Sequence, residues 1–469
     1  MIVRRGITLH VVEREQERLP FVDSLLRRWM ELGFQPVACR QAVEDVLRDP
    51  RSGASETLLR PRAVTDGGLV ATEALLYPAS EPALRIQVFD GDEPPRTVRA
   101  RFDEGSAGEV AALLWWVTGR ADTVTGPTWL PEWILTELTR PEVFPAPEFP
   151  RIEEPGIYRR EHACAVIRSR TTTIMLDPVA YWMPQGLRAP LASDGAIDAI
   201  FITHGHADHF NLASILAHVN DANTPVIVPP VPRPSLLAPN DMLRTLQMFG
   251  QRALAPNWGS SLLIGDIQVE VLPFFGEQPV REGEGPSRDL RNWGSCYRFT
   301  TPEFTAITLI DSGVDPLGNI ADVLGASRAE SGPADFLLSS LPRFHCPFFF
   351  GLPHYYLSLP FARLRSLFDQ YTNGKLPSVT PGPDGIVDAC RAGRPRYYLP
   401  YGNGFDGPGM SIEDVGMYIG EPPEAEVVRY LADRLAYHAI PTTPIAWNPG
   451  DRVSLKAGRA VRTACPPAI

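Results

Sequence analysis

One short segment constrains this chain more than any other. It reads Thr203-His204-Gly205-His206-Ala207-Asp208-His209 and follows the apolar run at residues 199–202. A buried strand that ends in a tight loop would present three imidazoles and one carboxylate from six consecutive positions. His204 and His206 can face one metal ion, while Asp208 and His209 can reach a second ion beside it. Since the chain has only nine histidines, such crowding argues against an ordinary helix-capping loop and predicts a dinuclear metal site.

The H-x-H-x-D-H string resembles the signature of the metallo-β-lactamase superfamily. Its surroundings agree with this resemblance, because an apolar strand precedes the string and a helix is expected at residues 211–218. Strands that alternate with helices are typical of a layered α/β body. The resemblance implies an α/β fold, the metallo-β-lactamase αββα sandwich. The strands we expect in it lie at residues 163–168, 172–176, 199–202, 225–231, 269–275, 306–310 and 336–339.

The same resemblance implies further ligands after later strands. The apolar run at residues 305–310 ends in Asp311-Ser312-Gly313, where the superfamily places a carboxylate that bridges two metals. Hydrolases of this fold also place a histidine after an earlier strand, but no histidine occurs between His218 and His345. Glu277 follows the strand expected at residues 269–275, so we predict that it replaces this histidine. The alternative is that Glu277 is a solvated loop acid.

The last histidine ligand is ambiguous. Relatives often have it after a strand of I-P-x-H type, but the matching piece here, Tyr398-Leu399-Pro400-Tyr401-Gly402, has none. We favour His354, with His345 and His438 as alternatives. Upstream, Asp177 is expected to support the metal loop by hydrogen bonding. His162, expected in the strand before Asp177, fits either a supporting role at the site or an ordinary core histidine.

The predicted donor set is rich in carboxylates, which bears on the choice of metal. Carboxylate oxygen is a harder donor than imidazole, so Asp208, Glu277 and Asp311 together suit iron or manganese better than an all-imidazole zinc pocket would. This shifts the expectation from hydrolysis toward oxidation.

Further segments resemble one particular family, the diiron β-hydroxylases of nonribosomal peptide assembly, whose type member acts in chloramphenicol biosynthesis. The resemblance covers roughly residues 150–345. The segments that carry it are residues 155–163, the hairpin through Thr171-Thr172-Thr173 to Asp177-Pro178, and Phe274-Phe275-Gly276-Glu277-Gln278-Pro279.

This second resemblance implies a function. Such enzymes use two iron ions, O₂ and an external electron donor to hydroxylate the β-carbon of an aminoacyl group on a carrier protein, in antibiotic biosynthesis. Carried over, His204, His206 and Glu277 would hold one iron, Asp208 and His209 the other, and Asp311 would bridge. The substrate would be an aminoacyl carrier protein or a small amino acid. The alternatives are a zinc or manganese hydrolase of an ester, lactone or phosphoester, and a non-catalytic scaffold.

Proline marks a boundary in the chain. Residues 141–150 contain four prolines, which disfavour both a helix and a central strand. We therefore predict a smaller α+β domain over residues 1–145 and the metallo-β-lactamase-fold catalytic domain over residues 150–469. The resemblance assigns the first domain to dimerisation, as in a homodimer, or to docking of the substrate or carrier. After a helix expected at residues 424–439, the end of the chain reads as irregular.

Composition limits partners and location. The net charge is −11, from 55 acidic and 44 basic residues, which argues against binding to nucleic acid. No run of about eighteen apolar residues suggests a membrane span, and no apolar signal core opens the chain. The six cysteines form no C-x-x-C pair and are expected to be free thiols. These features predict a cytoplasmic enzyme that binds neither nucleic acid nor a membrane.

Overall fold

The structure is a computed structural model of the chain. It describes residues 151–178, 195–206, 208–232, 241–276, 292–315, 317–341, 380–402 and 424–465, with five short strands before residue 102 and isolated positions at 108–112 and 366–375. Three of the predicted ligands or their alternatives, Glu277, His345 and His354, lie outside the described residues.

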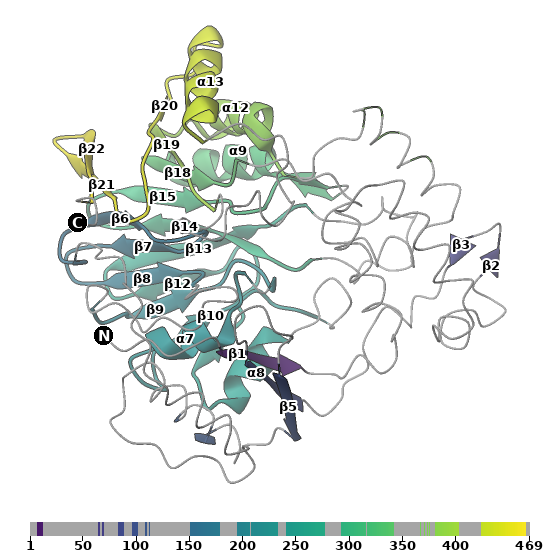
Figure 1. The fold of residues 1–469 in the computed structure, drawn as a ribbon. Coiled ribbons are helices and arrows are strands. Elements are labelled where there is room, and N and C mark those ends of the chain that lie inside the picture. Colours follow the sequence, from purple (N-terminus) through teal and green to yellow (C-terminus); the bar gives the residue numbers. More distant parts are fainter. Residues whose placement is uncertain are drawn as a thin grey trace.

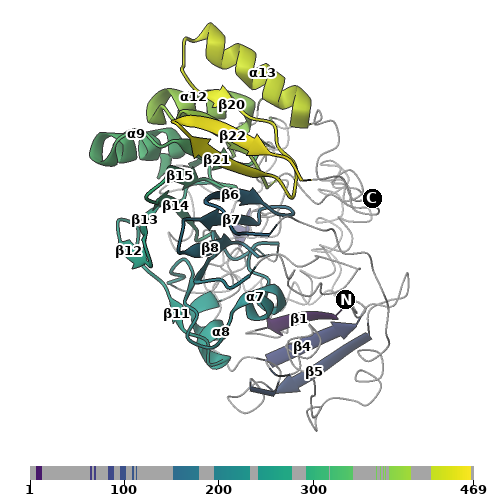
Figure 2. The same cartoon turned by 90° about the vertical axis from the view of Figure 1, so that its left-hand side faces the viewer.

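The N-terminal part contributes two small antiparallel sheets. Strands β1 (Ile7–Val12), β4 (Ala83–Val88) and β5 (Arg96–Arg101) form one sheet, and β2 (Val64–Thr65) pairs with β3 (Gly68–Leu69) in the other. Strand β1 lies beside helix α7 (Leu212–His218) of the larger body (Figure 2). The linker expected at residues 141–150 lies outside the described residues, so the division into domains at that point stays a prediction.

The first large sheet has eight strands in the order β11-β10-β9-β8-β7-β6-β21-β22. Its central strands β6, β7 and β8 are antiparallel, whereas β8, β9, β10 and β11 run parallel. The strands are β6 (Gly156–Arg159), β7 (Ala165–Arg168), β8 (Thr173–Leu176), β9 (Ala199–Phe201), β10 (Val226–Ile227), β11 (Ala253–Leu254), β21 (Arg452–Lys456) and β22 (Arg459–Thr463).

The second large sheet has seven strands in the order β12-β13-β14-β15-β18-β19-β20. Its strands β15, β18, β19 and β20 run parallel, and the others are antiparallel. The strands are β12 (Ser261–Ile264), β13 (Ile267–Pro273), β14 (Ser295–Thr300), β15 (Thr305–Thr308), β18 (Phe336–Ser339), β19 (Tyr397–Pro400) and β20 (Thr443–Pro444), with the separate pair β16 (Val314–Asp315) and β17 (Gly318–Asn319) beside them.

Helices cover both outer faces (Figures 1 and 2). Helices α7 and α8 (Met242–Met248) connect the parallel strands of the first sheet. Helices α9 (Ile320–Ser331), α12 (Gly382–Gly393) and α13 (Glu424–Tyr437) pack on the second sheet. One core cluster lies between the two sheets and another lies beneath these three helices. The predicted αββα sandwich is confirmed. None of the described helices is long and apolar enough to cross a bilayer.

The end of the chain corrects one expectation. It is not irregular, because β21 and β22 form a hairpin and β21 pairs with β6 at the edge of the first sheet. The turn between them is Ala457-Gly458, and both residues have positive φ, at 49° and 74°. That geometry suits a two-residue hairpin. The strand expected at residues 225–231 is also shorter than predicted, because prolines on both sides of β10 cannot donate ladder hydrogen bonds.

This topology brings several loops to one edge. The parallel strands β15, β18 and β19 all end there, and Asp311, Ser340 and Tyr401 follow them. The loop after β9 meets the second sheet at the same place, since Ser295 N donates to Thr203 O at 2.8 Å. In open α/β sheets, sites lie outside the carboxyl ends of such strands.

Candidate metal centre

The histidine-rich loop is held at both ends. Before it, Ile202 N donates to Ile227 O at 2.8 Å, which continues the pairing of β9 with β10. After it, the side chain of Asn211 caps α7 by accepting from Ser214 N at 2.9 Å. Within the loop, His209 N donates to His206 O at 3.0 Å. The loop therefore turns tightly and faces its side chains inward from two fixed elements.

The first group of donor atoms contains His204, His206, His209 and Asp311. Nε2 of His204 lies 3.0 Å from Nδ1 of His206. Oδ2 of Asp311 lies 3.2 Å from Nε2 of His209 and 3.8 Å from Nε2 of His204. Two ligand atoms bound about 2.1 Å from one ion lie about 3.0–3.4 Å apart at angles between octahedral and tetrahedral. The two shorter separations match this range.

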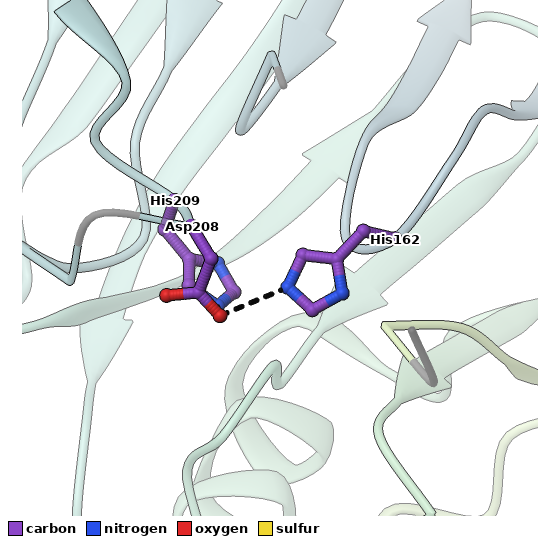
Figure 3. A group of neighbouring side chains, drawn as sticks. All are labelled: His162, Asp208 and His209. Carbon is purple, nitrogen blue, oxygen red and sulfur yellow. Dashed lines mark hydrogen bonds and ion pairs between the residues drawn. The ribbon is translucent and has the colours of Figure 1, made fainter. Parts of the chain in front are cut away.

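The second group contains His162, Asp208 and His209 (Figure 3). Oδ2 of Asp208 lies 3.1 Å from Nε2 of His162 and 3.6 Å from Nε2 of His209. We expected His162 in a strand. It lies instead in the turn between β6 and β7, with φ at 52°. Because His209 belongs to both groups, the two potential ion positions are adjacent.

Asp177 supports the histidine-rich loop through hydrogen bonds, as predicted. Its fully buried carboxylate accepts hydrogen bonds from Thr203 N at 2.7 Å and from Thr203 Oγ1 at 2.6 Å. Its Oδ2 also lies 2.9 Å from Nδ1 of His209. A histidine whose Nδ1 donates to a carboxylate presents its Nε2 lone pair to a metal, and this arrangement is common at metal sites.

Electrostatics in the cluster favour a cation. Burial lowers the pKa of His204 well below its ordinary value, and the neighbouring His209 and His206 lower it further. Burial acts to raise the pKa of Asp208, but the charge of His209 and the hydrogen bond to His162 outweigh it and hold this pKa well below its usual range. A neutral imidazole and an ionised carboxylate are the forms that bind metal.

His209 lies at the centre of the charge balance in this cluster. Burial acts to lower its pKa, but the charge of Asp208, the hydrogen bond with Asp177 and the nearby carboxylate of Asp311 outweigh it and raise the pKa well above the ordinary value. Its Nε2 is nevertheless buried without a hydrogen-bond partner in the described part of the chain. A metal ion can take the place of the proton on this atom. The residues present therefore fit divalent metal ions.

Asp311 adopts a special backbone conformation. Its φ is 52°, and its N donates to Ser340 Oγ at 3.3 Å. The next residue, Ser312, exchanges hydrogen bonds with Phe275, since Phe275 N donates to Ser312 Oγ and Ser312 Oγ donates to Phe275 O, both at 3.0 Å. Gly276 N donates to Asp315 Oδ2 at 3.0 Å. The segment that leads to Glu277 is thus bonded to the Asp311 loop as far as it is described.

Five of the seven predicted ligands meet in this cluster: His204, His206, Asp208, His209 and Asp311. Glu277 and His354 lie outside the described residues, as does the alternative His345, so these assignments stay predictions. The other alternative, His438, is exposed just beyond the end of α13, with its ring 5.0 Å from that of Tyr437.

Sequence reasoning underrated His162 and overlooked Tyr401. Tyr401 follows β19, and its N donates to Ser339 O at 3.1 Å. The side chain is fully buried, and its hydroxyl has no hydrogen-bond partner among the described residues. Burial raises the pKa of Tyr401 well above its ordinary value, and the charges of Asp177 and Asp311 add to this effect. The available signal was its place in the Leu399-Pro400-Tyr401-Gly402 string, one residue before the position that the I-P-x-H pattern gives to a histidine.

A matched pair of tyrosines tests this observation. We expect Tyr401→Phe to leave the free energy of unfolding of the metal-free protein unchanged or higher, because it removes an unpartnered buried hydroxyl. Tyr297→Phe should lower it by about 1–3 kcal/mol, since the Tyr297 hydroxyl donates to Ile202 O at 2.6 Å and leaves that carbonyl unpaired when it is removed. Urea denaturation of both variants measures the difference. Equal losses would contradict the prediction.

Known proteins resemble parts of this chain. Residues 172–321 match the family described as the beta-lactamase superfamily domain. Together with the two sheets and their helices, this decides the fold. The chain carries a metallo-β-lactamase fold. At the sequence level, a UPF0173 protein of Pyrococcus furiosus is 28% identical over 197 residues, which are 40% of this chain and 80% of that protein. An uncharacterized protein of Mycobacterium bovis is 26% identical over 36% of this chain and 48% of its own length.

A solved structure resembles nearly the whole chain. It is the crystal structure of CmlA, a diiron beta-hydroxylase from Streptomyces venezuelae. The match has a TM-score of 0.54 and covers 95% of this chain and 98% of the CmlA chain. The identity is 16%, so the likeness is one of fold.

Proposed function

We propose that this protein is an O₂-dependent dinuclear iron oxygenase that hydroxylates the β-carbon of an amino acid tethered to a carrier protein, in natural-product biosynthesis. The observation that carries the proposal is the cluster around His209, where two carboxylates, Asp208 and Asp311, face one buried imidazole nitrogen at 3.6 and 3.2 Å. Oxygen donors of this kind favour iron or manganese over zinc. The predicted ligand Glu277 would add a third carboxylate.

The fold supports the same proposal. The chain resembles a diiron beta-hydroxylase along nearly its entire length, including the part before the metallo-β-lactamase fold. Two iron ions, held by His204, His206 and Glu277 and by Asp208 and His209 with Asp311 between them, would supply the activation of O₂. The chain's own residues hold these donors in place, with Asp177 orienting His209.

The proposed reaction consumes one O₂ and two external electrons. One oxygen atom is inserted into a C–H bond of the β-carbon to give an alcohol, and the other leaves as water after taking up the two electrons and two protons. The partners in this proposal are therefore an aminoacyl carrier protein or a free amino acid, an electron donor, and a second copy of the chain as a homodimer. The compartment in this proposal is the cytoplasm.

The test begins with metal content. Protein from cells supplied with both iron and zinc should contain about two irons per chain and show near-ultraviolet absorption that dithionite bleaches. Carrier-bound amino acids incubated with O₂ and a reductant should then gain one oxygen atom in mass spectrometry. Two zincs, a featureless spectrum and turnover without O₂ would contradict the proposal.

A metal-dependent hydrolase is the second candidate. It is favoured by a relative named as a UPF0173 metal-dependent hydrolase, from Methanosphaerula palustris, which is 27% identical over 26% of this chain and 45% of its own length. Zinc or manganese in the same cluster would serve the hydrolysis of an ester, lactone or phosphoester. Such an activity would proceed without O₂ or reductant, and this separates the two candidates.

A further inference from the structure

The turn between β6 and β7 brings a histidine to the metal loop from a distant part of the sequence. His162 and Asp208 are 46 positions apart, yet Nε2 of the first lies 3.1 Å from Oδ2 of the second. We propose that His162 is a positioning residue, whose Nε2–H donates to Asp208 Oδ2 and holds that carboxylate toward the metal position beside His209. This inference rests on the metal centre of the proposed function but not on its oxygen chemistry.

The turn is built to place this side chain. Cys164 N donates to Glu161 O at 3.0 Å, and Arg160 N donates to Cys164 O at 2.9 Å, which closes a tight turn around His162. His162 has φ at 52°, a conformation that costs free energy in most residues. Strain of this kind persists where the surrounding structure holds it, and it often marks functional positions.

A third loop fixes the turn from the other side. Gly402 N, just beyond β19, donates to the backbone oxygen of His162 at 3.0 Å. A Cβ atom at position 402 would lie 2.0 Å from Cδ1 of Ile310, the residue before Asp311, and 3.8 Å from Cβ of Ala163. Gly402 therefore lets the end of β19 approach both the His162 turn and the Asp311 loop. The His162 turn and the loop of the predicted bridging residue Asp311 are therefore both packed against the end of β19.

The position of Asp208 explains why it needs such a partner. Its side chain is 23% exposed, whereas the side chain of His209 is fully buried. Oδ2 of Asp208 has His162 on one side, at 3.1 Å, and His209 on the other, at 3.6 Å. A carboxylate oxygen can accept one hydrogen bond and still offer a lone pair to a metal. Carboxylate ligands are commonly hydrogen-bonded in this way, and loss of the partner typically lowers metal affinity about 10–100-fold.

The alternative role for His162 is that of a metal ligand. Nε2 would then carry no proton, and both atoms of the 3.1 Å pair would face one ion. The two roles differ in what can replace the imidazole. A glutamine side chain can donate a hydrogen bond to Asp208 from its amide nitrogen, but it is a poor substitute for an imidazole ligand.

The experiment compares His162→Gln with His162→Leu. Both residues meet the same backbone strain at positive φ, so their difference isolates the hydrogen bond. Titration of metal-free protein with Mn²⁺ and with Zn²⁺ should show two sites in the unchanged protein. We expect His162→Leu to weaken one site about 10–100-fold and leave the other nearly unchanged. His162→Gln should recover most of the lost affinity.

Other outcomes would overturn the proposal. Loss of one ion from both variants would make His162 a ligand, and unchanged affinity in both would deny it any role at the site. If the leucine variant does not fold, His162→Asn takes its place, because asparagine tolerates positive φ and is too short to reach Asp208. The readout is metal affinity without O₂ or substrate, so failure of the oxygenase proposal would leave this result unaffected.

Discussion

Asp311→Asn is expected to remove at least one metal ion per chain and to lower turnover by more than about 100-fold. The reason is the central place of this carboxylate, whose Oδ2 lies within 3.2 Å of His209 Nε2 and 3.8 Å of His204 Nε2. Loss of a group that only supports a ligand typically lowers metal affinity or activity about 10–100-fold. Loss of a bridging ligand should lower both further. Metal analysis and steady-state turnover measure the effect.

Asparagine is the right replacement at this position. Asp311 has φ at 52°, and asparagine adopts that conformation more easily than most residues do. The fold should therefore survive, and only the negative charge is lost. Asp322→Asn is the matched control, because Asp322 is an exposed acid in the first turn of α9 nearby. Full metal content and turnover in Asp311→Asn would show that Asp311 is not a ligand.

The second large effect is expected for Asp177→Asn. This change should lower the free energy of unfolding of the metal-free protein by about 3 kcal/mol, because it removes the charge of a buried carboxylate that accepts hydrogen bonds. The asparagine NH₂ group would face either Thr203, whose N and Oγ1 now donate to Asp177, or His209 Nδ1. Metal affinity should also fall about 10–100-fold, since His209 loses the group that orients it.

Urea denaturation and Zn²⁺ titration measure these two losses separately. Asp198→Asn is the control, because Asp198 is exposed and accepts one backbone hydrogen bond, from Thr173 N at 2.7 Å. Asp198→Asn should lower the free energy of unfolding by about 1 kcal/mol or less and leave metal affinity unchanged. A stable Asp177→Asn variant with full Zn²⁺ affinity would contradict the supporting role of Asp177.

Local pattern was enough for the elements whose signals lie close together in the sequence. Strand β18 has the boundaries that its apolar run predicted, and α7 begins where Asn211 caps it. The histidine string could be interpreted in the same way, because six adjacent positions in a strand-loop-helix unit must lie near one another.

The hairpin at the chain end shows where this approach fails. Strand β21 pairs with β6, which lies almost three hundred positions earlier in the sequence. Its signal, the Ala457-Gly458 turn between alternating residues, is weak and was overlooked. Strand formation depends on which neighbour a segment packs against. No local feature of β21 names that neighbour.

The sequence by itself predicted the metal-binding loop, because the string from His204 to His209 is dense in donor side chains, and it placed Asp311 at the end of a recognisable strand. Only the tertiary structure decided which other groups join them. His162 and Tyr401 reach the site from separate turns, through the pairing of β6 with β7 and of β18 with β19. Backbone pairing between distant strands sets such neighbours, and the type of residue at each position does not reveal it.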